Sequence, residues 1–188
     1  MNQTKSNKQQ SKQARAEMRR EQAKRKKMIK RVGLFGGLFV LLTLIIIAFA
    51  FRPPSPGEKV TIMSDQSHIP DVTSPHKPYN SDPPTSGQHV ASTAPWGVHK
   101  DPLPKELLVH NLEDGDIVIY YNNQLDSSSI AELESIAEHY KEGVIVNPYP
   151  EMKNKITLTG WGRIDRLETV EKDSITKFIQ AYRGKNHH

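Results

Sequence analysis

Histidine is the residue type in this chain whose spacing could do chemistry. The 188 residues include eight histidines, and five of them fall between residues 68 and 110. Imidazole ligates metals, transfers protons and donates or accepts hydrogen bonds near neutral pH. Because the sequence has no cysteine, a zinc or copper site would use nitrogen and oxygen ligands, with a thioether from Met63 or Met152 as a further option.

One set of residues has the spacing of a metal site. If the chain around them is helical, His110 and Asp114 lie four residues apart on one face, with Glu113 beside them. Imidazole and carboxylate together can ligate a divalent ion, and His89 from the preceding loop would add a third ligand. His68 is a further candidate. We therefore predict that the His89 and His110 rings lie close enough to share a ligand, and that copper or zinc is the candidate cofactor.

Two other interpretations of these residues stay open. His89 and His110 could instead hydrogen-bond the backbone of a loop region with few ladder partners, which would leave a protein-interaction module at the cell envelope. Ser86 with His89 or His110 and Asp114 has the residue types of a hydrolytic triad. However, Thr85-Ser86-Gly87 lacks the strand–turn–helix context of a nucleophile elbow. A metal-dependent hydrolase is therefore the weaker alternative, and the chain is not predicted to be an enzyme.

The two tryptophans also admit two interpretations. Trp96 and Trp161 could stack on a ligand such as a sugar, since both have flat apolar rings. Both also stand beside glycines, where a tryptophan more often fills a core against a closely approaching backbone.

The clearest structural element is an apolar segment at residues 32–51. These twenty residues carry no charge and no proline, and as a helix they would span ~30 Å, the thickness of a bilayer's hydrocarbon core. A buried core helix and a cleaved signal peptide are the rival interpretations, the latter because Ala48-Phe49-Ala50 resembles a cleavage site. The apolar region is longer than a signal peptide's usual ~7–15 residues. We predict an uncleaved, single-pass transmembrane helix.

Charge is divided sharply on the two sides of this segment. The chain has a net charge of +5, but residues 1–31 hold twelve Lys/Arg and two Glu. The positive-inside rule therefore places residues 1–31 in the cytoplasm as a basic tail and the C-terminal domain outside the cell membrane. The rest of the chain is net acidic, which argues against nucleic-acid binding. The predicted partners are the lipid bilayer, through residues 32–51, and an envelope protein.

The region beyond the membrane is predicted to be one α+β domain at residues 62–184. A linker at 52–61 precedes it and a disordered C-terminus at 185–188 follows it. Eleven of the thirteen prolines fall between residues 53 and 104, mixed with apolar and aromatic residues. Prolines exclude long helices, while the apolar residues argue against disorder. We expect an ordered, loop-rich lobe there.

Helices and strands are predicted beyond the proline-rich lobe, in the order β-α-β-β-α after a short helix at 105–112. The three strands are at 117–121, 144–147 and 156–161. One helix opens at a capping box formed by Ser129 and Glu132, and the last helix covers 171–183. A right-handed crossover makes the first two strands parallel. A hairpin would add the third to a small mixed sheet with both helices on one face.

Five strings in this outer region stand out by their residue order. They are YNSDPPTSGQH at 79–89, APWGV at 94–98, LVHNLEDG at 108–115, NPYP at 147–150 and LTGWG at 158–162. Together they resemble a family of bacterial membrane-anchored proteins known as domain of unknown function 3105. The resemblance covers about residues 62–183 and implies a membrane anchor but no settled activity. Family members often carry a second histidine where this chain has Asp114.

Overall fold

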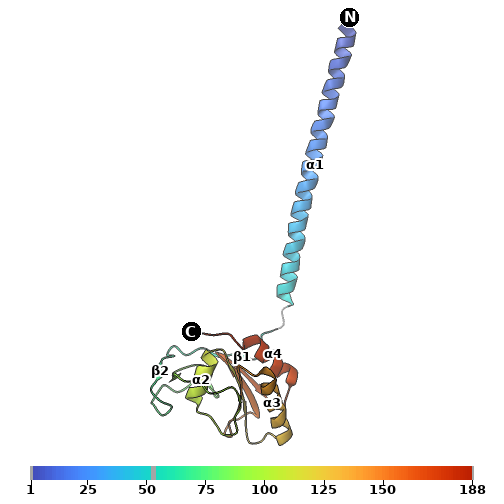
Figure 1. The fold of residues 1–188 in the computed structure, drawn as a ribbon. Coiled ribbons are helices and arrows are strands. Elements are labelled where there is room, and N and C mark those ends of the chain that lie inside the picture. The colour runs from blue at the N-terminus through green and yellow to red at the C-terminus, as the bar shows by residue number, and fades with distance from the viewer. Residues whose placement is uncertain (1, 52–53, 188) are drawn as a thin grey trace. The chain divides into compact units, whose positions relative to one another are not determined.

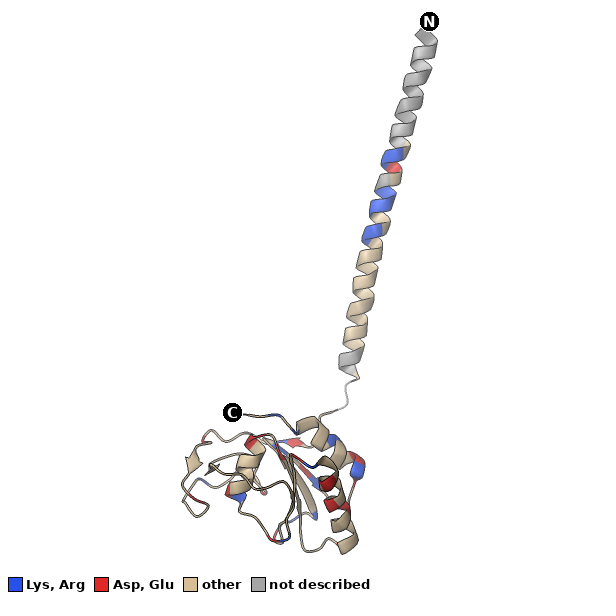
Figure 2. Cartoon of the chain, viewed as in Figure 1, with Lys and Arg blue, Asp and Glu red and all other residues tan. Residues whose placement is uncertain are grey.

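Helix α1 (Asn2–Ala50) opens the chain (Figure 1). The computed structural model describes residues 2–51 and 54–187, with the side chains of all but 2–17, 23 and 48–50. Within α1, the stretch Met18–Ile47 is long and apolar enough to cross a membrane, and its apolar window is not buried by protein. A run of basic residues precedes the apolar part of the helix (Figure 2).

The chain from Ser55 onward forms a second unit around a six-stranded mixed sheet. The strands lie in the order β1 (Glu58–Lys59), β8 (Arg163–Leu167), β7 (Ile156–Gly160), β5 (Ile117–Tyr121), β6 (Val144–Pro148) and β4 (Gly97–Val98). This arrangement confirms the predicted α+β class, with an apolar N-terminal helix followed by a mixed sheet.

The centre of the sheet is the parallel pair β5 and β6. Ile119 of β5 lies opposite Val146 of β6, and helix α3 (Ser127–Tyr140) makes the crossover between them. On its other side β5 pairs antiparallel with β7, where Ile119 faces Leu158. All five residues of β5 are buried, because the sheet is covered on both faces.

Two cores form on the two faces of the sheet, as the alternation of side chains along a strand requires. Helices α3 and α4 (Lys172–Tyr182) pack on the face that carries Ile117 and Ile119. Helix α2 (Lys105–Glu113) packs on the opposite face, which carries Val118 and Tyr120. The two predicted helices thus share one face, and the short helix holds the other.

The proline-rich lobe is built from turns and a two-stranded parallel sheet of β2 (His68–Ile69) and β3 (His89–Val90). Strand β3 packs against α2. Side chains supply hydrogen bonds that strand pairing would supply in a larger sheet. For example, Ser86 Oγ accepts a hydrogen bond from the Met63 amide at 3.0 Å. Asn111 of α2 bonds both backbone groups of Ala94. The lobe is therefore tied to the helix that carries His110.

The predicted hairpin between the second and third strands is wrong. β7 is antiparallel, as expected, but it pairs with β5 instead of β6. The free edge of β6 is taken by β4. The connecting loop crosses the end of β5, where the Tyr149 amide bonds the Tyr121 carbonyl at 2.7 Å. The chain then forms β8, which sequence analysis did not predict, antiparallel to β7.

The predicted capping box at Ser129 is also wrong. Helix α3 begins at Ser127, and Asp126 is its N-cap. The Asp126 carboxylate accepts hydrogen bonds from the Ser129 amide at 2.9 Å and the Ser129 hydroxyl at 2.8 Å. Aspartate is a strong N-cap, so the N-cap lies three residues before the predicted one.

Both predicted margins of the domain differ from expectation. Glu58 and Lys59, expected in the linker, pair with Ile164 and Arg163 at the sheet edge. In the C-terminal segment expected to be disordered, the His187 amide bonds the Glu113 carbonyl at the end of α2, at 2.9 Å. Residues 52, 53 and 188 of these predicted segments lie outside the described residues.

Candidate metal centre

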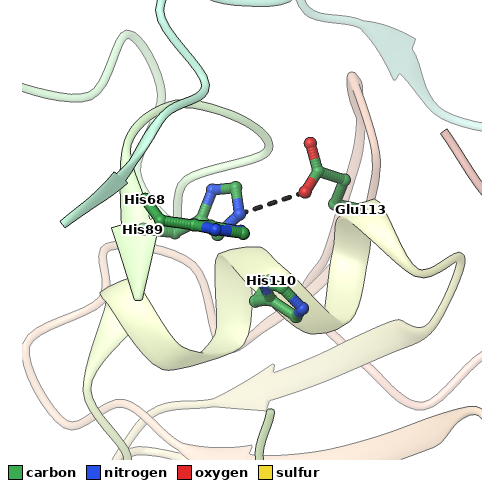
Figure 3. A group of neighbouring side chains, drawn as sticks. All are labelled: His68, His89, His110 and Glu113. Carbon is green, nitrogen blue, oxygen red and sulfur yellow. Dashed lines mark ion pairs between the residues drawn. The ribbon is translucent and has the colours of Figure 1, made fainter. Parts of the chain in front are cut away.

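Four of the five predicted site residues come together between the lobe and α2. His68 and His89 lie directly opposite each other in the β2–β3 pair. His110 and Glu113 come from one side of α2, three residues apart (Figure 3). One ligand atom from each of the four lies within 4.8 Å of the others. The site thus joins three segments that are well separated in the sequence.

Local sequence explains the position of α2. Pro104 stands at its N-cap, and the helix ends at Glu113, with Asp114 as C-cap. Gly115 follows with φ +92°, a conformation that favours glycine. Leu108 and Leu112 are fully buried against the sheet. Packing of that apolar face turns the opposite side of α2, with His110 and Glu113, toward β3.

The three imidazole rings form a nearly equilateral group. Ring centroids are 5.0 Å apart for His68 and His89, 5.0 Å for His89 and His110, and 5.2 Å for His68 and His110. In a tetrahedral zinc site with Zn–N bonds of ~2.0–2.1 Å, two ligand atoms lie about 3.3 Å apart. The four ligand atoms lie within 4.8 Å of one another, so closing them around one ion requires the most distant pair to approach by up to about 1.5 Å.

His89 Nε2 faces a carboxylate oxygen of Glu113. Its Nδ1 lies 2.8 Å from the Gly87 carbonyl oxygen, which only accepts, so Nδ1 carries the proton. In neutral His89 the other nitrogen, Nε2, is then an acceptor. Yet Nε2 lies 3.1 Å from Glu113 Oε2 (Figure 3), without the alignment of a hydrogen bond. Two acceptors repel at this distance, and either a proton on Nε2, which makes the contact an ion pair, or a bound cation would relieve the repulsion.

Burial raises the free-energy cost of an uncompensated charge at this contact. The His89 side chain is fully buried and Glu113 is 6 % exposed, and an uncompensated charge in such a place is costly. Burial lowers the pKa of His110, and the neighbouring His89 and His68 act in the same direction, while Asp114 opposes them. A neutral His110 offers a lone pair to a metal at neutral pH. His68 is exposed and leaves one side of the cluster open to solvent.

Asp114, the fifth predicted residue, stands beside the cluster. Its Oδ2 lies 3.8 Å from His110 Nε2, and the group of four that gathers its ligand atoms within 4.8 Å does not include it. The carboxylate is therefore placed to orient His110, as acids commonly do for ligating imidazoles. Glu113, one residue earlier, takes the position facing His89.

The other residues that the sequence suggested form hydrogen bonds or fill the core. Ser86 is fully buried, and its Oγ accepts a long-range hydrogen bond from the Met63 amide, 23 residues earlier in the chain. The Met63 sulfur packs against Gly87, and Met152 lies in the core beneath α2. Trp161 is 7 % exposed and fills that same core.

Two aromatic neighbours of the site were not predicted. Trp161 meets the His89 ring edge to face at 6.4 Å, and the His187 ring stacks on Trp161 at 6.1 Å. The His187 amide bonds the Glu113 carbonyl at 2.9 Å. No signal in the sequence could have placed His187 beside the site, because the C-terminal residues have neither periodicity nor apolar character.

Comparison with known proteins gives one match. A family model described as a protein of unknown function (DUF3105) matches residues 73–188. His89, His110 and Glu113 lie inside the matched region, whereas His68 precedes it. No curated protein and no solved structure matches the chain.

Proposed function

The chain belongs to the DUF3105 family of proteins of unknown function, and we propose that its folded domain binds one zinc or copper ion through His68, His89, His110 and Glu113. The observation that carries this proposal is the contact between His89 Nε2 and Glu113 Oε2 at 3.1 Å. A bound cation would turn this acceptor–acceptor contact into two metal–ligand bonds. Three imidazoles and one carboxylate suit borderline ions such as Zn²⁺ and Cu²⁺.

We propose further that α1 anchors the domain in the cell membrane as a single-pass helix, with the metal site outside. The support for this is the apolar stretch within Met18–Ile47 and the basic residues before it, which favour a cytoplasmic N-terminus. An envelope protein remains the proposed macromolecular partner. A metal site outside the membrane, with one ligand exposed, would take up its ion directly from the surroundings of the cell.

The metal proposal is tested on the full chain in detergent micelles. After treatment with EDTA, the protein is titrated with Zn²⁺ or Cu²⁺ by calorimetry, and one ion per chain is expected. His89→Ala and Glu113→Gln should each weaken binding at least about tenfold, the fold-change that the loss of one ligand commonly exceeds. His139→Ala is the matched control, because His139 lies on α3. Equal binding by His89→Ala and His139→Ala would refute the site.

The orientation can be tested without background because the sequence has no cysteine. Single-cysteine variants Ser6→Cys and Ser92→Cys are treated in intact cells with a membrane-impermeant maleimide. We expect labelling at position 92 alone, and labelling at position 6 alone would reverse the proposed orientation. A mature chain that begins near Phe51 would show that the anchor is removed.

A further inference from the structure

A cavity lies at the C-terminal end of α2, next to the histidine cluster. It has a volume of about 480 Å³, and its lining includes Trp96, Asn111, Asp114 and Asp116. Asn111 and Asp114 belong to the last part of α2 and its C-cap. The cavity thus stands on the same helix as the candidate metal centre, and Asp114 lies between the two.

Asp116 is a buried carboxylate in the wall of this cavity. It is 8 % exposed, and its Oδ2 accepts hydrogen bonds from Trp96 Nε1 and Asn111 Nδ2, each at 2.8 Å. Both donors are neutral. Among residues 54–187, no Lys, Arg or His nitrogen forms an ion pair with it within 4.0 Å. Buried carboxylates are usually paired with a cation, whereas this one has two neutral hydrogen-bond donors.

Burial changes the pKa of the Asp116 carboxyl group. It raises the pKa of Asp116, against the two hydrogen bonds and the longer-range attraction of Arg183, which lower it. A raised pKa shows that the surroundings do not fully compensate the charge of the ionised carboxylate. A cation entering the cavity would supply the missing compensation.

Trp96 is the second feature that indicates a ligand. It is 49 % exposed, although most of the other large apolar residues of this domain are buried. Its hydrogen bond to Asp116 fixes the indole beside the cavity. Tryptophan is the best aromatic partner for a cation above its ring. Asp114, whose side chain is 38 % exposed, adds a second carboxylate to the lining.

We propose that this cavity binds an organic cation, a guanidinium or alkylammonium group, which stacks on Trp96 and pairs with Asp116 and Asp114. The group comes either from an arginine or lysine side chain of a protein or from a free amine. This proposal does not depend on the metal centre. If Asp116 served only to hold Trp96 and Asn111 in place, the cavity would have no preference for cations.

The test uses the full chain in detergent micelles with EDTA present, so that metal binding cannot contribute. The chain has two tryptophans, and therefore two indole N–H signals in a ¹⁵N correlation spectrum. The probe is the peptide Ac-Gly-Arg-Gly-NH₂, with the uncharged citrulline peptide as its matched control. We expect a saturable shift of the Trp96 signal with arginine, little shift with citrulline, and an unmoved Trp161 signal.

Variants and a second probe complete the test. Trp96→Leu and Asp116→Asn should each weaken binding of the arginine peptide about tenfold, the fold-change of a cation–π or ion-pair contact. Methylguanidinium as probe separates the two sources of the cation: equal affinity favours a free amine, and much tighter binding of the peptide favours a protein side chain. Equal shifts from arginine and citrulline in the wild-type chain, or none from either cation, would overturn the proposal even if a variant failed to fold.

Discussion

His68 and His89 are register partners in the parallel β2–β3 pair, and their ring centroids lie 5.0 Å apart. This two-residue ladder is the only strand pairing of β2 in the described residues. An ion bound by both rings would connect the β2 segment to β3, and through His110 it would also connect the lobe to α2. The proposed metal is therefore expected to stabilise the lobe as well as to occupy a site.

Metal binding should raise the melting temperature of the domain. A ligand that binds only the folded state at about 100 times its Kd stabilises by ~2.7 kcal/mol. For a domain of this size that corresponds to about 10 °C. Thermal unfolding of the full chain in micelles, followed by near-UV circular dichroism with and without Zn²⁺, measures it. Glu113→Gln should lose most of the shift, and a wild-type chain that melts alike with and without metal would contradict the proposal.

Metal affinity should fall as the solution becomes acidic. Protons compete with the ion for imidazole nitrogens, and an ordinary imidazole titrates near pH ~6.5. Because burial lowers the pKa of His110, that ring stays neutral to a lower pH than an ordinary one. The Kd should be flat above pH ~7.5 and weaken about tenfold or more by pH ~5.5, as measured by calorimetry. An affinity that is unchanged over this range would show that imidazoles are not the ligands.

Ile119 should be a large contributor to stability. It is fully buried in the central strand, among the side chains beneath α3 and α4. Ile119→Ala should cost ~2–5 kcal/mol in the free energy of unfolding. Ile62→Ala is the matched control because Ile62 is 43 % exposed, and it should cost much less. Chemical denaturation followed by circular dichroism compares the two, and equal midpoints would contradict the central position of β5.

The start of α3 gives a comparison between neighbouring residues. Asp126→Ala removes the N-cap acceptor, whereas Ser129→Ala leaves the bond from the Ser129 amide intact. Asp126→Ala should therefore lower the melting temperature more at pH 7. The side-chain bond from Ser128 and the bonds from Ser129 hold the pKa of Asp126 below its usual value. Its contribution is present above the pKa of the unfolded chain and is lost as pH falls, so the difference should shrink in acid.

Sequence patterns predicted the elements whose apolar residues recur regularly. The continuous apolar run at 117–121 gave the central strand, and the spacing of Ile175, Phe178 and Ile179 gave the last helix. The strand β8 was missed because three of its five residues, Arg163–Leu167, are charged and its two apolar residues are three positions apart, which does not match the alternation of a strand. The order of strands was mispredicted because local patterns do not show that β4 occupies the free edge of β6.

The candidate site was predictable where helical spacing decides geometry. His110 and Glu113 lie on one side of α2, as a separation of three residues requires. Helical spacing alone could not decide between Glu113 and Asp114, since each is one turn from His110. The choice depends on where β3 lies, which is a matter of tertiary packing. The meeting of His68 with His89 is likewise set by a two-residue strand pair too short to have a sequence pattern.

The measurement that tests the central claim most directly is an anomalous difference map from crystals of the full chain grown with Zn²⁺ and recorded at the zinc absorption edge. The proposal predicts one strong peak per chain, ~2.0–2.2 Å from a ring nitrogen of His68, His89 and His110 and from a carboxylate oxygen of Glu113. A map without a peak among these four residues, with Glu113 still facing His89, would contradict it.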